Sequence, residues 1–257
     1  MNLTLTKAEK KYLNALSLKK YRDREACFIV EGEKSVAEFA ASDFSVKKIY
    51  KTQDCKFSDN SVETVLISTS EMQQISNLKT PSPVLAVVEI PDSKMSEFSE
   101  NDLILVLDDI QDPGNLGALI RLADWFGIRQ IICSPFSADA YGPKTVQATM
   151  GSLTRTHVNY RNLPDFLKSL NGKIPVYGTF LNGEIIYSSQ LSSSGIIVMG
   201  NEGKGISSEV ARHVSRRLYI PAFNENRPES LNVTTAAAIV CSEFRRRTRC
   251  DVQSMLL

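Results

Sequence analysis

The chain has 257 residues, of which 42% are hydrophobic and 23% are charged, and its net charge is +1 at pH 7. This composition is ordinary for a soluble globular protein, and the length suits one large domain or two modest ones. No apolar run approaches the ~18 residues of a membrane helix, which argues against a membrane protein. The five cysteines are scattered and the histidines number two, so neither a disulfide framework nor a metal site is predicted.

The first third of the chain alternates between strand and helix patterns. A charged helical stretch opens it, and residues 32–41 carry apolar side chains at helical spacing. Short strands are predicted over residues 26–30, 46–50, 64–67 and 84–88. Residues 1–90 are therefore expected to form a small α/β domain, and the polar, acidic residues 91–102 a linker.

Residues 103–257 repeat the order strand, helix, strand. Strands are predicted over residues 103–107, 130–133, 176–180, 195–199 and 217–220, and helices over residues 115–126 and 232–247. The continuous apolar strand at 103–107 is typical of a strand that is covered on both faces. The expected fold is a mostly parallel α/β sheet with helices on both faces.

Basic residues are unevenly distributed. One cluster lies near the N-terminus and a second near the C-terminus, and such clusters can bind phosphates. A solvated helix face is the alternative explanation. The clusters comprise Lys7, Lys10, Lys11, Lys19, Lys20, Arg22 and Arg24, and then Arg212, Arg216, Arg217, Arg245, Arg246, Arg247 and Arg249.

Three polar loops follow strands of the second half. The first spans residues 108–117 and leads into Arg121. Asn115 has a helix N-cap as its simplest role, and Arg121 a surface ion pair with Asp124. Because ligands of parallel sheets bind at the carboxyl ends of strands, this loop is also a candidate binding segment.

The second loop is Gly200-Asn201-Glu202-Gly203-Lys204-Gly205. Its spacing fits neither a phosphate-binding P-loop nor a dinucleotide-binding fingerprint, and a tight turn is its simplest explanation. The third begins at Ile220-Pro221 and continues through Glu229-Ser230-Leu231-Asn232 into the last helix, where Ser230 can act as a cap. Together the three loops predict a polar small-ligand site.

These segments resemble the three motifs of the SpoU/TrmH family, RNA 2′-O-methyltransferases of the SPOUT class. The first motif matches as Asp112-Pro113-Gly114-Asn115-Leu116-Gly117 with Arg121, and the second as Gly200-Asn201-Glu202-Gly203. The third matches as Ile220-Pro221 and Ser230-Leu231-Asn232-Val233. Residues 20–24, 28–32 and 81–88 resemble the L30e-like substrate-binding domain that is often fused to this family.

The resemblance implies transfer of a methyl group from S-adenosylmethionine to a ribose 2′-hydroxyl of RNA, without a metal. It also implies a C-terminal trefoil knot and a homodimer with its active site near the subunit interface. The implied catalytic residues are Arg121, Asn115, Glu202, Ser230 and Asn232, and the implied cofactor-binding residues are Thr179, Gly200, Ile220 and Leu231. Arg121 acts either as general base or as a phosphate clamp, and Asn115 orients either Arg121 or the ribose.

The substrate and the location are less defined. The fused first domain favours ribosomal RNA, with a tRNA methyltransferase or a non-catalytic RNA-binding relative as alternatives. The absence of a signal-peptide pattern favours the cytoplasm. The segment 222–228 departs from the family pattern, because it is two residues longer and lacks a glycine. That departure leaves the cofactor contacts of this loop open.

Overall fold

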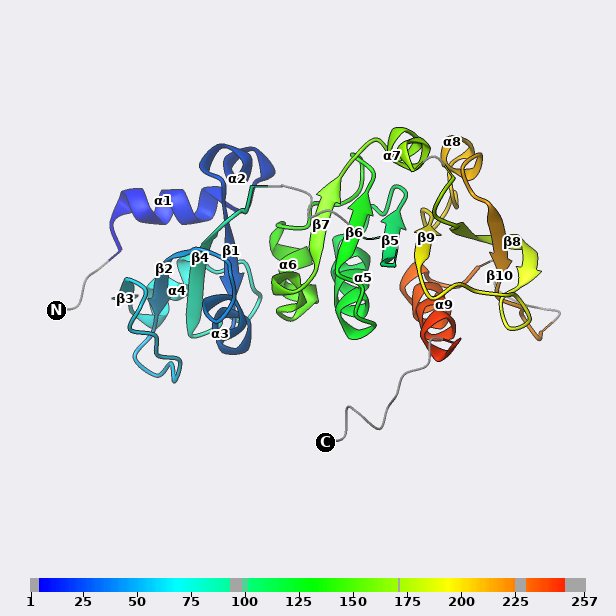
Figure 1. Ribbon diagram of the computed structural model, residues 1–257. Helices are drawn as coiled ribbons and strands as arrows, with labels where there is room; N and C mark the ends of the chain where they lie inside the picture. Colours follow the sequence, from blue (N-terminus) through cyan, green and yellow to red (C-terminus); the bar gives the residue numbers. More distant parts are fainter. Residues whose placement is uncertain (1–4, 93–98, 100, 171, 225–229, 248–257) are drawn as a thin grey trace. The chain divides into compact units, whose positions relative to one another are not determined.

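The computed structural model of the chain describes residues 5–92, 99, 101–170, 172–224 and 230–247. Within these residues the fold divides into two compact units (Figure 1). One unit comprises the described parts of Met1–Lys94 together with Asp139–Thr154, and the other the described parts of Met95–Ala138 and Arg155–Leu257. The predicted domain limits, 1–90, 91–102 and 103–257, stay a prediction.

The first unit is built on a four-stranded mixed sheet in the order β1-β4-β2-β3. The strands are β1 (Cys27–Glu31), β2 (Val46–Lys51), β3 (Thr64–Leu66) and β4 (Val84–Glu89). β4 runs antiparallel to both of its neighbours, whereas β2 and β3 are parallel. The helices are α1 (Lys7–Ala15), α2 (Lys19–Glu25), α3 (Glu33–Ala40) and α4 (Thr69–Ile75). The four predicted strands are all present, within one or two residues of their predicted limits.

Two helices of this unit begin with reciprocal capping boxes. In α1 the Thr6 side chain accepts from the Glu9 backbone N–H, and Glu9 accepts from Thr6 in return. Ser68 and Glu71 repeat this arrangement in α4. Each box satisfies backbone donors that a helix start otherwise leaves without a partner.

Residues Asp139–Thr154 belong to the first unit, where their helix α6 (Pro143–Thr149) contacts β1. The Arg22 side chain is only 4% exposed, and its Nη2 lies 2.6 Å from Asp139 Oδ2. Its Nη1 donates to the carbonyl oxygens of Leu16 and Ser17, each at 2.8 Å. Arg22 was predicted among the phosphate-binding basic residues, and that expectation is wrong, because its guanidinium is buried and bonded within the unit.

The second unit contains a six-stranded sheet in the order β10-β8-β9-β5-β6-β7, in which every pairing is parallel. Its strands are β5 (Leu103–Leu107), β6 (Gln130–Cys133), β7 (His157–Tyr160), β8 (Val176–Ile185), β9 (Gly195–Met199) and β10 (Arg216–Tyr219). The predicted parallel α/β sheet is confirmed. The edge strand β7 was not predicted, because its four residues carry no continuous apolar run.

Helices cover both faces of this sheet, as predicted. α7 (Leu163–Ser169) and α8 (Ser208–Ala211) pack on one face, in a buried cluster with Ile104, Val106 and Val198. α5 (Pro113–Trp125) and α9 (Val233–Arg247) pack against each other (Figure 1). The ring centroid of Phe244 in α9 lies 4.9 Å from that of Tyr177 in β8. The predicted trefoil knot stays a prediction.

The four described cysteines are free thiols: Cys27, Cys55, Cys133 and Cys241. Burial raises the pKa of the Cys241 thiol to about 12 and raises that of Cys133 as well. Both thiols therefore act as small apolar core groups rather than as nucleophiles. Cys250 lies outside the described residues. Within the described chain, no helix combines the length and apolar character needed to cross a membrane.

Candidate active site

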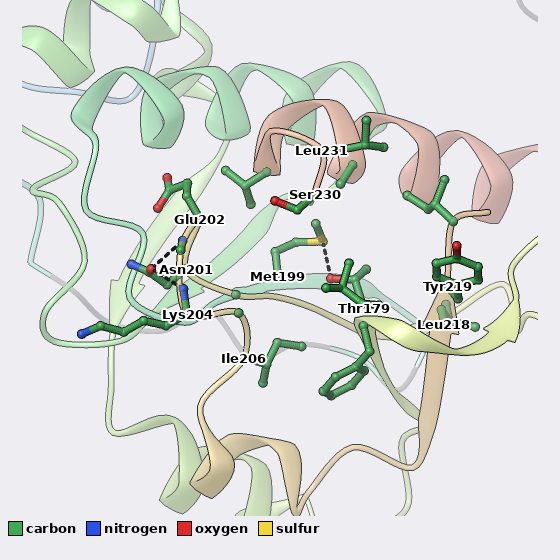
Figure 2. A pocket seen from close by; sticks show the side chains of 18 residues that line it. Thr179, Met199, Asn201, Glu202, Lys204, Ile206, Leu218, Tyr219, Ser230 and Leu231 are labelled. Atoms are coloured by element: carbon green, nitrogen blue, oxygen red, sulfur yellow. Dashed lines mark hydrogen bonds between the residues drawn. The ribbon is translucent and has the colours of Figure 1, made fainter. Parts of the chain in front are cut away.

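A cavity of about 430 Å³ opens at the carboxyl ends of β8, β9 and β10 (Figure 2). The second and third predicted loops line this cavity and the first is hydrogen-bonded to the second, because parallel strands bring their carboxyl ends to one edge of the sheet. One wall is apolar, and polar side chains and a glycine-rich loop form the rest. The lining residues are Thr179, Phe180, Leu181, Met199, Gly200, Asn201, Glu202, Gly203, Lys204, Gly205, Ile206, Leu218, Tyr219, Ile220, Ser230, Leu231, Val233 and Ala236.

The four residues predicted to bind the cofactor all line this cavity. Thr179 lies where β8 leaves its pairing with β10. The partner of β10 changes from Gly178 to Glu184 between Arg217 and Leu218, so the five intervening residues of β8 bulge out of the ladder. Thr179 Oγ1 lies 3.4 Å from the Val198 carbonyl oxygen and 3.7 Å from Met199 Sδ, which holds its side chain at the cavity (Figure 2).

The loop after β9 is closed by the side chain of Asn201. Its Oδ1 accepts from the backbone N–H groups of Gly203 and Lys204, both at 3.0 Å. Gly200 must be glycine, because a Cβ there would lie 2.2 Å from the backbone carbon of Gly205. Sequence reasoning missed the role of Asn201, although an asparagine among glycines is a common signal of a side-chain-closed turn.

The loop after β5 is tied to the loop after β9. Asn201 Nδ2 donates to the Asp109 carbonyl oxygen at 2.8 Å, and the buried Asp108 carboxylate accepts from the Ser207 backbone N–H at 2.7 Å. Asp109 has a φ of 60°, in the left-handed region that aspartate tolerates better than most residues. The two loops are therefore held as one rigid edge.

Asn115 does not cap α5. The cap is Asp112, whose side chain accepts from the Asn115 backbone N–H at 2.9 Å, and α5 begins at Pro113, two residues before its predicted start. Proline has no backbone N–H, and at the first position of a helix that N–H would have had no partner within the helix. Pro113 is therefore well suited to begin α5. The Asn115 amide is consequently available for a contact outside its own helix.

A chain of side-chain hydrogen bonds joins the three motif segments. Asn115 Nδ2 donates to Glu202 Oε1 at 2.8 Å, and Asn232 Nδ2 donates to Asn115 Oδ1 at 3.3 Å. Asn232 Oδ1 accepts from the Thr234 backbone N–H at 2.9 Å. Both amides thus have a defined orientation, set by the carboxylate at one end and the helix start at the other.

The residue that caps α9 also differs from the predicted one. Asn232 directly precedes the helix and takes the capping position expected of Ser230, while Ser230 lines the cavity. Glu229 and most of the 222–228 segment lie outside the described residues.

Arg121 stands apart from the other predicted catalytic residues. It is exposed, does not line the cavity and makes no hydrogen bond or ion pair with any residue that the structure describes. Its predicted partner Asp124 binds Arg155 instead, at 2.9 Å. Arg121 lies six positions after Asn115, a rotation of about 240° around the helix, so Asn115 does not orient it within one chain.

The chemical character of the cavity suits an organic ligand with an apolar ring and a positive or polar end. Met199, Ile206 and Leu218 form an apolar wall. The Glu202 carboxylate and the hydroxyl groups of Thr179 and Ser230 supply the polar side. The described residues contain no cluster of histidine, cysteine or carboxylate side chains that would hold a metal ion.

Comparisons with known proteins agree over most of the chain. The SpoU rRNA Methylase family matches residues 102–242, and the MRM3-like substrate binding domain matches residues 8–86. The 23S rRNA (guanosine(2553)-2′-O)-methyltransferase RlmP of Bacillus subtilis is 32% identical over 235 residues, which cover 90% of this chain and 93% of that protein.

Solved structures show the same architecture. A structure from Porphyromonas gingivalis, assigned to the TrmH family of RNA methyltransferases, is 40% identical with a TM-score of 0.85, and covers 95% of this chain and 99% of its own. An AdoMet-bound rRNA methyltransferase from Sinorhizobium meliloti is 27% identical with a TM-score of 0.83, and covers 95% and 97%.

Proposed function

Because the chain belongs to the SpoU rRNA methylase family, we propose that it transfers a methyl group from S-adenosylmethionine to a ribose 2′-hydroxyl of 23S ribosomal RNA. The observation that carries the proposal is the cavity at the carboxyl edge of the parallel sheet: the second and third motif segments line it, and Asn115 of the first is joined to them by its hydrogen bonds to Glu202 and Asn232. The RlmP relative acts on a guanosine of 23S rRNA, and a guanosine is accordingly the proposed target.

S-adenosylmethionine fits the residues that line the cavity. A cavity of about 430 Å³ lies in the range of small-molecule sites. The apolar wall of Met199, Ile206 and Leu218 suits the adenine ring, and the Glu202 carboxylate suits a cationic ligand. The predicted assignment of Thr179, Gly200, Ile220 and Leu231 to this cofactor rests on their shared position in the wall.

The methyl donor supplies an electrophilic carbon on a sulfonium, so the reaction needs no metal activation. With the donor bound, the ribose oxygen would take the methyl carbon as the carbon–sulfur bond breaks, which would leave neutral S-adenosylhomocysteine, and the hydroxyl proton would pass to solvent water. The protein must align the two reactants, and alignment alone contributes ~7 kcal/mol or more in favourable cases. We assign this task to Glu202, Asn115 and Asn232, whose side chains hold one another in fixed orientations.

For Arg121 we propose a phosphate clamp rather than a general base. A guanidinium is a permanent cation in water, and its planar donors match a phosphate group. Arg121 is exposed and has no partner among the described residues, so its donors are available to RNA.

The position of Arg121 also supports the proposal of a homodimer. In one chain Arg121 is not among the residues that line the cavity, and a second copy packed along α5 would bring its own Arg121 to the shared site. Mixing inactive Arg121→Ala and Glu202→Ala subunits tests this arrangement. Recovered activity in the mixture supports a shared site, and no recovery despite subunit exchange contradicts it.

The first unit is the proposed RNA-binding part, in line with the substrate-binding domain that matches residues 8–86. Lys11, Lys20 and Arg24 are exposed on α1 and α2. Replacing Lys11 and Lys20 by glutamate should weaken rRNA binding and reduce its salt dependence. Unchanged binding at low salt would contradict a role for this surface. Since ribosomal RNA is the substrate, the cytoplasm is the proposed location.

The proposed function is tested by mapping 2′-O-methylation on total RNA from cells with and without the gene. One 23S rRNA nucleotide should lose its methyl group, and purified protein should restore it with S-adenosylmethionine. A lost methyl group in tRNA alone would overturn the rRNA assignment. Binding of rRNA without any methyl transfer would point to the non-catalytic alternative.

A further inference from the structure

A tight turn after β6 holds an exposed phenylalanine at the same edge of the sheet as the cavity. The turn is Ser134-Pro135-Phe136-Ser137, closed by a hydrogen bond from the Ser137 N–H to the Ser134 carbonyl oxygen at 3.1 Å. Proline at its second position favours such a turn. Phe136 occupies the third position and is 81% exposed, so its ring contributes almost nothing to the core.

The base of this turn is rigid. The Ser134 hydroxyl accepts from the Asp109 N–H at 2.9 Å and lies 3.1 Å from the Ser137 hydroxyl. The Ile110 N–H donates to the Ser137 hydroxyl at 3.2 Å, and the Ala138 N–H to the Ile110 carbonyl oxygen at 2.7 Å. A fixed frame therefore presents a largely exposed ring.

This frame is continuous with the proposed active site. Asp109, which donates to Ser134, accepts from Asn201 of the loop that lines the cavity. The turn is thus two hydrogen bonds away from Asn201. The turn therefore has a defined position relative to the loop that lines the cavity.

The neighbouring strand adds a second aromatic ring and a cation. Tyr160, the last residue of β7 and the partner of Cys133, is 38% exposed, and its hydroxyl donates to the Ala138 carbonyl oxygen. Arg161 follows it and is exposed, and its guanidinium bonds to no residue within the described ranges. Aromatic rings beside an arginine are the usual combination for stacking unpaired bases and holding their phosphates.

We propose that Phe136, Tyr160 and Arg161 form a stacking platform for an unpaired RNA base that flanks the methylated nucleotide. The proposal rests on the proposed function and adds a substrate contact outside the three motifs. Phe136 stacks on the base, Tyr160 braces the turn, and Arg161 contacts the adjoining phosphate. A ring on a rigid support binds a base with little loss of conformational entropy.

The test measures methyl transfer to 23S rRNA purified from cells that lack the gene. Phe136→Ala and Phe136→Leu should each raise KM for this RNA by roughly ten-fold, in the range of base–aromatic stacking, with cofactor affinity unchanged. Phe136→Tyr should restore the wild-type KM. If Phe136→Leu is as active as the wild type, or KM for Phe136→Ala is unchanged, the platform is wrong.

Trp125→Ala is the matched control. Trp125 is 85% exposed at the last residue of α5, which leads to the opposite edge of the sheet. Its loss should leave KM for RNA unchanged, with the molar mass in solution measured for every variant so that an effect on assembly is recognised. An equal rise in KM for Trp125→Ala at unchanged mass would contradict a site specific to Phe136.

Filter binding of the same 23S rRNA separates this proposal from the proposed function. If the wild type binds RNA but transfers no methyl group, the proposed function fails while the platform is still tested by the affinity of Phe136→Ala. Weaker binding of that variant supports the platform, and equal binding overturns it. Ultraviolet cross-linking should also attach RNA to the peptide that contains Phe136. Absence of that cross-link, with others formed, would count against the proposal.

Discussion

Arg22 and Arg121 are two arginines in opposite surroundings. Arg22, in the first unit, is buried, pairs with Asp139 and donates to two backbone carbonyl groups. Arg121, on α5 of the second unit, is exposed and bonds to none of the residues that the structure describes. The sequence predicted a nucleic-acid role for both. The contrast teaches that a basic residue is available to a substrate only where the fold leaves its donors unused.

The largest expected effect concerns Arg22. Arg22→Ala should lower the free energy of unfolding by about 3–5 kcal/mol, because it leaves the Asp139 carboxylate without its partner. Chemical denaturation measures this, and Lys19→Ala is the control, since Lys19 forms only an exposed pair with Asp23 at 3.1 Å. Equal stability of both variants would contradict the distinction between buried and exposed basic side chains.

Arg121→Ala should lower activity and leave stability unchanged, the opposite of the effect expected for Arg22→Ala. Methyl transfer should fall by about 100-fold or more through misplaced substrate, while the melting temperature and the binding of S-adenosylmethionine are retained. Arg129, another exposed arginine at the amino end of β6, provides the control as Arg129→Ala. Wild-type turnover by Arg121→Ala would refute the assignment, and a lowered melting temperature would show a structural role.

Asp112 and Asn115 sharpen the comparison within a single helix turn. Asp112→Ala removes the cap of α5 and should cost about 1 kcal/mol of stability. Asn115→Ala removes the hydrogen bonds to Glu202 and Asn232. It should lower activity about ten-fold, a loss in free energy that corresponds to the net contribution of about one hydrogen bond. Thermal melts and initial rates on both variants distinguish them. The reverse assignment of the two effects would contradict the hydrogen-bond pattern described above.

The smallest expected effect lies at the capping box of α4. Hydrogen bonds from the Ser68 backbone and hydroxyl hold the pKa of Glu71 below its usual value. The resulting stabilisation is present above the pKa of the unfolded chain and is lost as the pH falls through the lowered folded-state pKa. Glu71→Gln should therefore cost less than about 1 kcal/mol near neutral pH and nothing in acid. A difference from the wild type that persists in acid would contradict this account.

Much of the fold and the chemical class followed from local patterns. Continuous apolar strands such as 103–107 and the helical spacing of Leu116, Leu119 and Ala123 predicted a parallel α/β sheet, which the structure confirms. Three short motifs in order indicated the SpoU/TrmH family, and the match over residues 102–242 confirms it. Such signals are readable because strand burial and helix amphipathicity repeat with fixed periods along the chain.

Individual roles within the site were less predictable. Asn115 and Ser230 were both expected to be helix caps in their simplest roles, yet Asp112 and Asn232 take those positions. The role of Asn201, whose side chain holds the loop after β9 together, was not predicted. Cap identity depends on backbone angles of one or two residues, and composition leaves those angles undecided when several polar residues are adjacent.

The amino-acid sequence by itself determined the alternation of strands and helices, the family and the set of polar residues from which an active site could be made. Only the tertiary structure decided which of those residues meet. In the fold, hydrogen bonds connect Asn115, Glu202 and Asn232, which span 117 residues of the chain. The Arg22 side chain is buried beside Asp139, whereas Arg121 and Phe136 are exposed. The reason is physical: periodicity is a local property, whereas a hydrogen-bond partner is supplied by whichever segment the folded chain brings within about 3 Å.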